Sequence, residues 1–197
     1  GKTVVYFAEN EQVIGLVALM DVPNEEAMNA IHYFKSQNIE TTMITGDAKL
    51  TGEAVGRLVG VDQVFANVLP EEKSAIVDQL KREVGMTGMV GDGINDAPAL
   101  VNADIGVAMG DGTDIAIDVA DVVVMKNDLS KLGYAHRVSK RLNKIVQQNI
   151  IFSMLVVATL IILNFLGIAN IAFSVLIHEG STLVVIFNGL RLLVNTK

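Results

Sequence analysis

Three short polar stretches follow apolar runs and carry side chains suited to phosphoryl chemistry. The clearest is Gly91-Asp92-Gly93-Ile94-Asn95-Asp96, directly after the apolar run 87–90. Two carboxylates four residues apart, with glycines that allow close approach of the backbone, suit a Mg²⁺ ion shared with a phosphate group. On its own, a Gly-Asp-Gly sequence is more typical of an acidic surface turn.

The other two stretches add groups that would act on the same phosphate. Thr45-Gly46-Asp47 offers a hydroxyl and backbone amides for a transferring phosphoryl group. Lys73, in Leu69-Pro70-Glu71-Glu72-Lys73, opens a predicted helix, where its ammonium would neutralise phosphoryl oxygens. A surface turn and a solvated lysine are the alternatives for each alone. The ordered set of hydroxyl, lysine and paired aspartates is more specific than any of its members.

A separate set of polar residues lies in an apolar segment, at His178-Glu179-Gly180-Ser181-Thr182. An ionisable residue inside a bilayer span costs at least ~2.5 kcal/mol and by default indicates a functional site. Imidazole and carboxylate suit Zn²⁺, Cd²⁺ or Co²⁺, whereas Cu⁺ favours sulfur ligands. The alternative is a His-Glu pair that makes interhelical hydrogen bonds. On the preceding apolar segment, Ser153, Thr159 and Asn164 are better explained by helix packing than by ligation.

The elements that must position the first set alternate between strands and helices. After strands at 3–8 and 13–19, the pattern predicts strands at 41–45, 64–66, 87–90, 105–108 and 122–125, with helices near 23–34, 50–59, 71–82, 97–101 and 113–120. This alternation indicates a doubly wound α/β domain with a mostly parallel sheet. Ligands bind such sheets at the carboxyl ends of the strands, where the three polar stretches fall.

The second set belongs to a predicted transmembrane helical hairpin. A helix at 129–148 continues without a break into an apolar span at 150–166, and a turn at 167–170 leads to a second span at 171–193. Basic residues flank both ends of the hairpin, namely Arg137, Lys140, Arg141, Lys144, Arg191 and Lys197. By the positive-inside tendency, both ends and the α/β domain are cytoplasmic.

Composition agrees with one acidic domain followed by a membrane segment. The 197 residues carry a net charge of −7 and are 51% hydrophobic, with the apolar residues concentrated after residue 150. The first part is long enough for one domain. Sustained basic runs that would indicate a nucleic-acid partner are lacking, and without cysteine the chain forms no disulfide. Because it begins at Gly1 and enters an apolar run at once, we expect a fragment.

The order of the polar stretches resembles the phosphorylation domain of P-type ATPases, which belong to the haloacid dehalogenase-like superfamily. The resemblance extends through Ala97-Pro98-Ala99-Leu100, Gly110-Asp111-Gly112-Thr113-Asp114 and Ala120-Asp121. It implies that Asp92 and Asp96 bind Mg²⁺, with Asn95 and Asp96 also supporting the metal and phosphate. It further implies that Thr45 and Lys73 contact phosphate, and that Gly46 and Asp47 lie near ATP.

The membrane set resembles the last-helix signature of cobalt/zinc-type heavy-metal P-type ATPases. That resemblance implies ATP-driven export of Zn²⁺, Co²⁺ or Cd²⁺ across a membrane, which we expect to be the plasma (inner) membrane. It also implies that His178, Glu179, Ser181 and Thr182 form the metal site. The family's Asp-Lys-Thr-Gly-Thr nucleophile motif does not occur in this sequence. The actuator and nucleotide-binding domains and the earlier helices, one with a Ser-Pro-Cys motif, are also missing. The chain alone is therefore expected to be inactive, with the missing N-terminal part as its partner.

The resemblance divides the chain into five parts. We expect a strand pair at 1–20 that joins the nucleotide-binding and phosphorylation domains, the C-terminal part of the phosphorylation domain at 21–128, a stalk helix at 129–148, and transmembrane helices at 149–167 and 171–194. One alternative is a non-catalytic, membrane-anchored metal-binding or regulatory fragment, which the missing nucleophile supports. Another is a membrane-tethered phosphatase of the soluble type, against which His178 and Glu179 argue.

Overall fold

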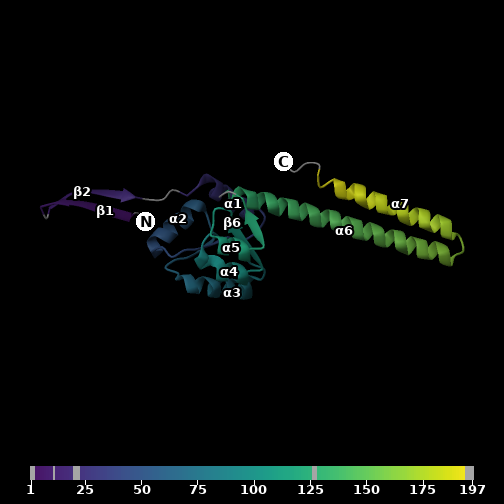
Figure 1. Ribbon diagram of the computed structural model, residues 1–197, viewed down its shortest axis with the longest axis horizontal. Coiled ribbons are helices and arrows are strands. Elements are labelled where there is room, and N and C mark those ends of the chain that lie inside the picture. The colour runs from purple at the N-terminus through teal and green to yellow at the C-terminus, as the bar shows by residue number, and fades with distance from the viewer. Residues whose placement is uncertain (1–2, 11, 20–22, 126–127, 194–197) are drawn as a thin grey trace. The chain divides into compact units, whose positions relative to one another are not determined.

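The computed structural model describes residues 3–10, 12–19, 23–125 and 128–193 (Figure 1). Two compact units divide the chain between Gly133 and Tyr134. The predicted domain boundaries at residues 20–21 and at 194, and the basic Lys197, lie outside the described residues.

The first two strands form an antiparallel ribbon, as predicted. β1 (Thr3–Glu9) pairs with β2 (Gln12–Leu19), and the register shifts between Phe7 and Ala8. Asn10 has a positive φ of 48°, a conformation that Asn tolerates at tight turns. Because two strands cannot bury both faces of a sheet, apolar side chains such as Tyr6 and Ile14 stay exposed.

The predicted alternation of strands and helices is confirmed, with small differences at the element ends. In chain order it comprises α1 (Glu25–Ser36), β3 (Thr42–Ile44), α2 (Lys49–Val59), β4 (Gln63–Phe65), the 3₁₀ turn η1 (Pro70–Glu72), α3 (Lys73–Val84), β5 (Gly88–Gly91), the 3₁₀ turn η2 (Ile94–Asp96), α4 (Ala97–Asn102), β6 (Ile105–Met109), α5 (Asp114–Val119) and β7 (Val122–Val124). All strand pairs in this region are parallel within the described residues. The pairing differs from one continuous sheet, because β3–β4 and β5–β6–β7 form separate ladders.

β6 is the centre of the core and is buried on both faces. On one face, Ala108 packs with Leu100 of α4 and Ala116 of α5. On the other face, the cluster comprises Val107, Met109 and Val124, with Leu129 and Leu132 packed against it. Helices thus cover one face and the residues around the start of α6 (Ser130–Phe165) cover the other. Burial on both sides explains why 105–109 is almost uniformly apolar rather than alternating.

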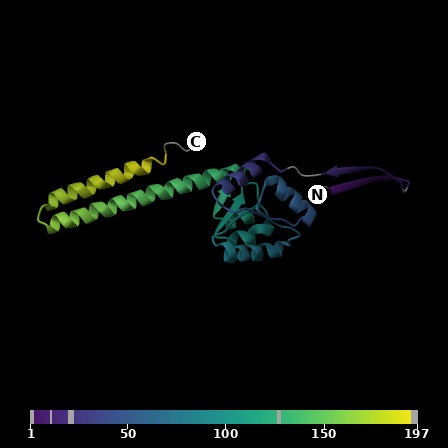
Figure 2. The ribbon, with the colours of Figure 1, turned by 180° about the vertical axis from the view of Figure 1, so that it is seen from behind.

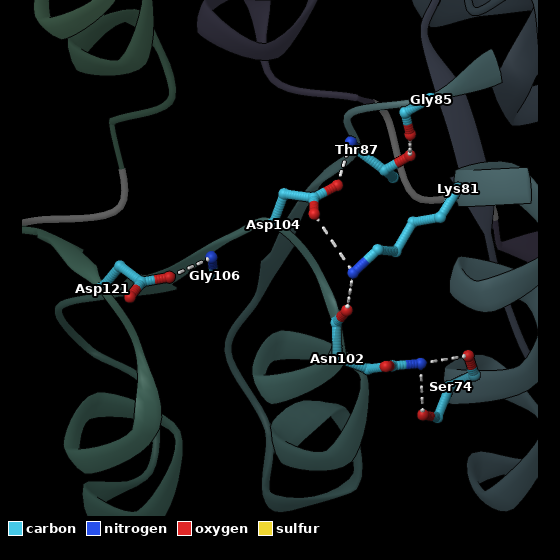
Figure 3. Close-up of polar contacts among 8 residues, drawn as sticks. All are labelled: Ser74, Lys81, Gly85, Thr87, Asn102, Asp104, Gly106 and Asp121. Atoms are coloured by element: carbon cyan, nitrogen blue, oxygen red, sulfur yellow. Dashed lines mark hydrogen bonds and ion pairs between the residues drawn. The ribbon is translucent and has the colours of Figure 1, made fainter.

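At the amino ends of the strands, aspartates tie neighbouring elements together. Asp104, just before β6, accepts a hydrogen bond from the Thr87 amide (2.8 Å) and forms an ion pair with Lys81 Nζ (3.2 Å), as Figure 3 shows. Lys81 Nζ also donates to the Asn102 carbonyl (2.8 Å). Asp121, before β7, accepts from the Gly106 amide (2.8 Å). These carboxylates satisfy amides at the sheet edge opposite Asp92.

The same arrangement recurs in the β3–β4 ladder. Asp62, just before β4, accepts from the Thr41 amide (2.9 Å) and pairs with Lys35 Nζ (2.7 Å), while Lys35 Nζ donates to the Gly60 carbonyl (2.9 Å). In each case a lysine from the last turn of a helix pairs with the aspartate and donates a hydrogen bond to the carbonyl of the residue two positions before that aspartate. The lysine-aspartate clamp therefore fixes a helix end against the starts of two parallel strands.

We expect the clamps to make the stability of the α/β unit depend on pH. The Lys35 ammonium and the Thr41 amide lower the pKa of Asp62 from 3.8 to about 2, and the Thr87 amide and Lys81 lower the pKa of Asp104. Both pKa values are depressed by folding, so this stabilisation is present above pH 3.8 and is lost as the pH falls toward 2.

Urea unfolding of the full chain in detergent, followed by circular dichroism between pH 6 and 2, would measure this dependence. Asp62→Asn should flatten the decline in that window and lower stability at pH 6. Asp118→Asn is the matched control, because Asp118 is exposed on α5. Equal acid sensitivity of Asp62→Asn and the unmodified chain would contradict the assignment.

The second unit contains the predicted helical hairpin. α6 and α7 (Ile171–Leu190) are long and apolar enough to cross a membrane, and both ribbon views show them side by side (Figures 1 and 2). Gly167 adopts a positive φ of 69° in the turn, and Asn170 caps α7 by accepting from the Phe173 amide (2.8 Å). Near the other end of α7, Asn188 Nδ2 donates to Asn149 Oδ1 (2.9 Å), which fixes the register of the two helices.

Candidate phosphoryl-transfer and metal sites

Lys73 and Asp96 form an ion pair in which both side chains are largely buried. Lys73 Nζ lies 2.6 Å from Asp96 Oδ1, and the side chains are 18% and 9% exposed. The turn before α3 positions the lysine, since Pro70 starts η1 and Glu72 Oε2 accepts from the Leu69 amide (2.9 Å). Because the pair is largely buried, removing either partner would leave the other as an unpaired buried charge and destabilise the fold.

The loop after β5 wraps around the Asp96 carboxylate. Its Oδ2 accepts hydrogen bonds from the amides of Asp92 (3.3 Å) and Gly93 (3.2 Å). A Cβ at Gly91 would approach the Asp96 Cβ to 2.6 Å, so this approach requires glycine. Asp96 therefore orients the loop that carries Asp92.

Asp92 is exposed, and its carboxylate has no hydrogen-bond or ion-pair partner among the described residues. Its carbonyl accepts from the Thr113 amide (2.9 Å), and Thr113 Oγ1 caps α5 by accepting from the Ala116 amide (3.4 Å). A Cβ at Gly112 would lie 2.6 Å from the Asp92 carbonyl oxygen and 2.8 Å from that of Met109. The loop between β6 and α5 thus fixes the peptide of Asp92.

These contacts test the predicted magnesium ligands. A carboxylate without a protein partner, at the end of a strand, fits the hard oxygen ligation that Mg²⁺ prefers, so Asp92 fits. Both oxygens of Asp96 already accept from an ammonium or from amides. Direct ligation by Asp96 stays a prediction, and its contacts favour the supporting role that was also predicted. Asn95 is exposed.

Thr45 and Asp47 form a second local arrangement at the end of β3. The Thr45 hydroxyl donates to Asp47 Oδ2 (2.9 Å) and accepts from the Asp47 amide (3.1 Å). Gly46 between them leaves room for the Val68 carbonyl, 3.4 Å from where a Cβ would lie. Within the described residues, no hydrogen bond or ion pair links this pair to Lys73 or Asp96.

In the helical hairpin, His178 and Glu179 line an open groove between α6 and α7. The other polar residues of the groove are Asn164 and Ser174, and its remaining lining is apolar: Val157, Leu160, Ile161, Phe165 and Val175. Ser181 Oγ and Thr182 Oγ1 instead donate to the His178 carbonyl, at 2.6 and 3.3 Å. Such back-bonding is common for hydroxyls inside helices. In the part of the chain that the structure describes, no third His, Cys, Asp or Glu joins His178 and Glu179.

Three features of these sites escaped the sequence interpretation. Lys73 was expected to contact phosphate, but its direct ion pair with Asp96 was not anticipated. The contact from Thr113 to Asp92 had a signal, because Gly112-Thr113 lies in a glycine-rich turn before a helix, yet turn composition does not reveal its partner. Asn164 was assigned to helix packing, although it lines the groove of His178 and Glu179.

Comparisons with known proteins agree on one family. A family model for haloacid dehalogenase-like hydrolases matches residues 1–104. The chain is 47% identical over 193 residues to a zinc-transporting ATPase of Bacillus subtilis (strain 168), covering 98% of the chain and 30% of that protein. It is 42% identical over 178 residues to a probable copper-importing P-type ATPase A of Enterococcus hirae, covering 89% of the chain and 24% of that protein.

A solved structure matches both units. The crystal structure of a zinc-transporting PIB-type ATPase in the E2.Pi state is similar with a TM-score of 0.93 and 34% identity, over 98% of this chain and 32% of that one. The chain therefore spans about 30% of the length of the relatives that it matches.

Proposed function

Because the chain belongs to the haloacid dehalogenase-like hydrolases and corresponds to part of the metal-transporting P-type ATPases, we propose that it supplies the phosphoryl-stabilising groups and part of the ion site of an ATP-driven metal pump. The pump would export a divalent transition metal, Zn²⁺, Co²⁺ or Cd²⁺. The observation that carries this proposal is the presence in one chain of the Lys73–Asp96–Asp92 arrangement and a groove with His178 and Glu179.

In the phosphoryl site, each residue has a distinct part. Asp92 would hold Mg²⁺, which neutralises charge on the phosphoryl oxygens when bound. Asp96 holds the Asp92 loop in place and keeps the Lys73 ammonium close to it. Lys73 would offset negative charge that develops during transfer, and the Thr45 hydroxyl would donate to a phosphoryl oxygen in place of Asp47. Gly46 and Asp47 would lie near the nucleotide.

The separation of the two ladders suggests where the nucleophile enters. β3 and β5 are each paired on one side only within the described residues, which leaves a ladder edge on each strand. We propose that a strand from the remainder of the pump, bearing the nucleophilic aspartate, pairs between them. Its carboxyl end would then lie between Thr45 and Asp92, since the carboxyl ends of parallel strands share one sheet edge.

In the membrane, His178 and Glu179 would bind the metal together with ligands from helices outside this chain. Nitrogen and oxygen donors favour Zn²⁺, Co²⁺ or Cd²⁺ over Cu⁺. Two protein ligands fall short of the four that a closed zinc site uses, which agrees with a site shared among helices. The basic residues at both ends of the hairpin support a cytoplasmic α/β domain. We further propose that the hairpin lies in the plasma (inner) membrane, among lipid. Ser181 and Thr182 remain candidate ligands.

Gly112→Ala should weaken magnesium use by the complete pump. The added Cβ would overlap two backbone carbonyls, so the peptide of Asp92 must move. A displacement approaching 1 Å can reduce catalysis by about 10²-fold, so we expect the magnesium concentration for half-maximal phosphoenzyme formation to rise about 10-fold or more. Gly88→Ala is the control, because a Cβ there meets only an ordinary contact at 3.7 Å. An unchanged magnesium dependence in Gly112→Ala would remove this positioning role.

The proposed function can be tested by transport. The complete pump, reconstituted in proteoliposomes with its α/β domain outward, should accumulate Zn²⁺ inside when Mg²⁺ and ATP are added. Accumulation should stop in Asp92→Asn and His178→Ala and continue in Asp118→Asn. Zinc uptake that persists in Asp92→Asn would show that ATP-driven transport does not require the Asp92 carboxylate.

A further inference from the structure

The geometry points to a second polar position for the transported ion. We propose that Asn164 and Ser174 form a transient, oxygen-only binding step between the His178–Glu179 site and the hairpin turn. This inference rests on the proposed pump function and concerns the path by which the metal leaves. A divalent transition metal with part of its hydration shell is the ligand.

The first support is that these residues share one groove. Among its nine lining residues, the polar ones are Asn164, Ser174, His178 and Glu179. The apolar remainder offers no metal ligand. An ion that left His178 and Glu179 along this groove would therefore meet Asn164 and Ser174 as its next polar partners.

The second support is the hydrogen bonding of Asn164. Its Nδ2 donates to the Leu160 carbonyl (2.8 Å) and to Ser174 Oγ (2.9 Å). Both amide hydrogens are thereby used, and within the described residues Oδ1 receives no hydrogen bond. Asn164 is exposed along the groove, so this oxygen is accessible to an ion. A cation or its bound water would satisfy it, and the Ser174 hydroxyl lies beside it.

The third support is the order of residues along α7. Ser174 precedes His178 by four residues, so it lies about 6 Å, slightly more than one helical turn, nearer the turn at 167–170. If both ends of the hairpin are cytoplasmic, that turn faces the other side of the membrane, which is the direction of export. Neutral oxygens bind Zn²⁺ more weakly than imidazole with carboxylate, which suits a step from which the ion must depart.

By contrast, Ser181 and Thr182 lie on the other side of His178 in sequence. Their hydroxyls donate to the His178 carbonyl, and they are not part of the groove lining. The structure thus favours Asn164 and Ser174 over these two hydroxyls as the polar groups that the ion meets beyond Glu179.

The test uses the complete pump in proteoliposomes with Zn²⁺. Asn164→Leu should lower the maximal rate of zinc transport about tenfold, while the amount of zinc bound per pump and the zinc concentration for half-maximal rate stay unchanged. Asn164→Gln keeps a neutral amide oxygen and should recover most of the rate. Thr159→Val is the matched control on α6, since Thr159 does not line the groove.

Each outcome decides between a transport role and helix packing. Transport by Asn164→Leu at the unmodified rate would overturn the inference, as would equal losses in Asn164→Leu and Asn164→Gln with a lowered thermal midpoint in both. His178→Ala and Glu179→Ala, assayed alongside, separate a failure of the proposed metal site from a failure of the second polar position. If these variants transport zinc normally, the proposed pump site fails; if they are inactive while Asn164→Leu is normal, only the second position fails.

Discussion

Replacing Lys73 with methionine should abolish phosphoryl transfer in the complete pump and destabilise the α/β unit. The substitution leaves the Asp96 carboxylate, 9% exposed, without its cation. Breaking a buried pair by removing one partner costs about 3–5 kcal/mol, and the partial exposure of Lys73 places the expected loss near about 3 kcal/mol. Loss of one positioned cation at the phosphoryl group should reduce phosphoenzyme formation at least ~100-fold.

A double-mutant cycle separates these two effects. Asp96→Asn in the Lys73→Met background removes the unpaired charge and should restore much of the lost stability, measured by urea unfolding of the full chain in detergent. It should not restore phosphoenzyme formation from radiolabelled ATP. Lys73→Arg retains the charge and serves as the conservative variant. Equal unfolding free energies for Lys73→Met and the double variant would show that the unpaired Asp96 charge is not the cause of the lost stability.

Replacing Glu179 with alanine should remove high-affinity zinc binding from the membrane site. In the proposed site the carboxylate would neutralise charge on the cation, which a neutral His178 imidazole would not do. Substitution of an outer-shell partner already costs 10–100-fold in affinity, so loss of a direct ligand should cost at least ~100-fold. Equilibrium dialysis of the detergent-solubilised pump with Zn²⁺ would measure the change.

Two variants make this binding test specific. Glu179→Gln keeps the size and one oxygen but loses the charge, so it should bind zinc with intermediate affinity. Thr159→Val alters a polar residue of α6 outside the groove and should bind zinc normally. Unchanged zinc affinity in Glu179→Ala would exclude Glu179 as a ligand.

The strands and helices could be predicted because their residues carry strong local signals. The apolar run 105–108 predicted a strand, and β6 occupies it; that β6 is packed on both faces is seen only in the structure. The helix at 129–148 was predicted to continue into the apolar span because no Gly or Pro separates the two, and α6 is uninterrupted there. Local patterns do not state which strands are neighbours, so the separation of β3–β4 from β5–β6–β7 was not foreseen.

The candidate sites were predictable in composition but not in their contacts. Strand-end position and motif order selected Thr45, Lys73 and Asp92 as candidates, and their roles stay a prediction. The partner of Lys73 depends on how η1, directly before α3, packs against η2, which no local pattern encodes. The paired clamps at Asp62 and Asp104 were missed for the same reason: an isolated aspartate before a strand looks like any turn residue until the amide beside it is located.

We propose that this chain belongs to a divalent-metal pump whose ion site includes Glu179 and whose phosphoryl site includes Asp92. ATP hydrolysis by the complete pump tests both sites together, with Zn²⁺, Cd²⁺, Co²⁺ or Cu⁺ added to the unmodified form, Glu179→Ala and Asp92→Asn. We expect the three divalent ions to stimulate hydrolysis, and both substitutions to abolish that stimulation. Stimulation by Cu⁺ alone, or undiminished stimulation by Zn²⁺ in Glu179→Ala, would contradict the account.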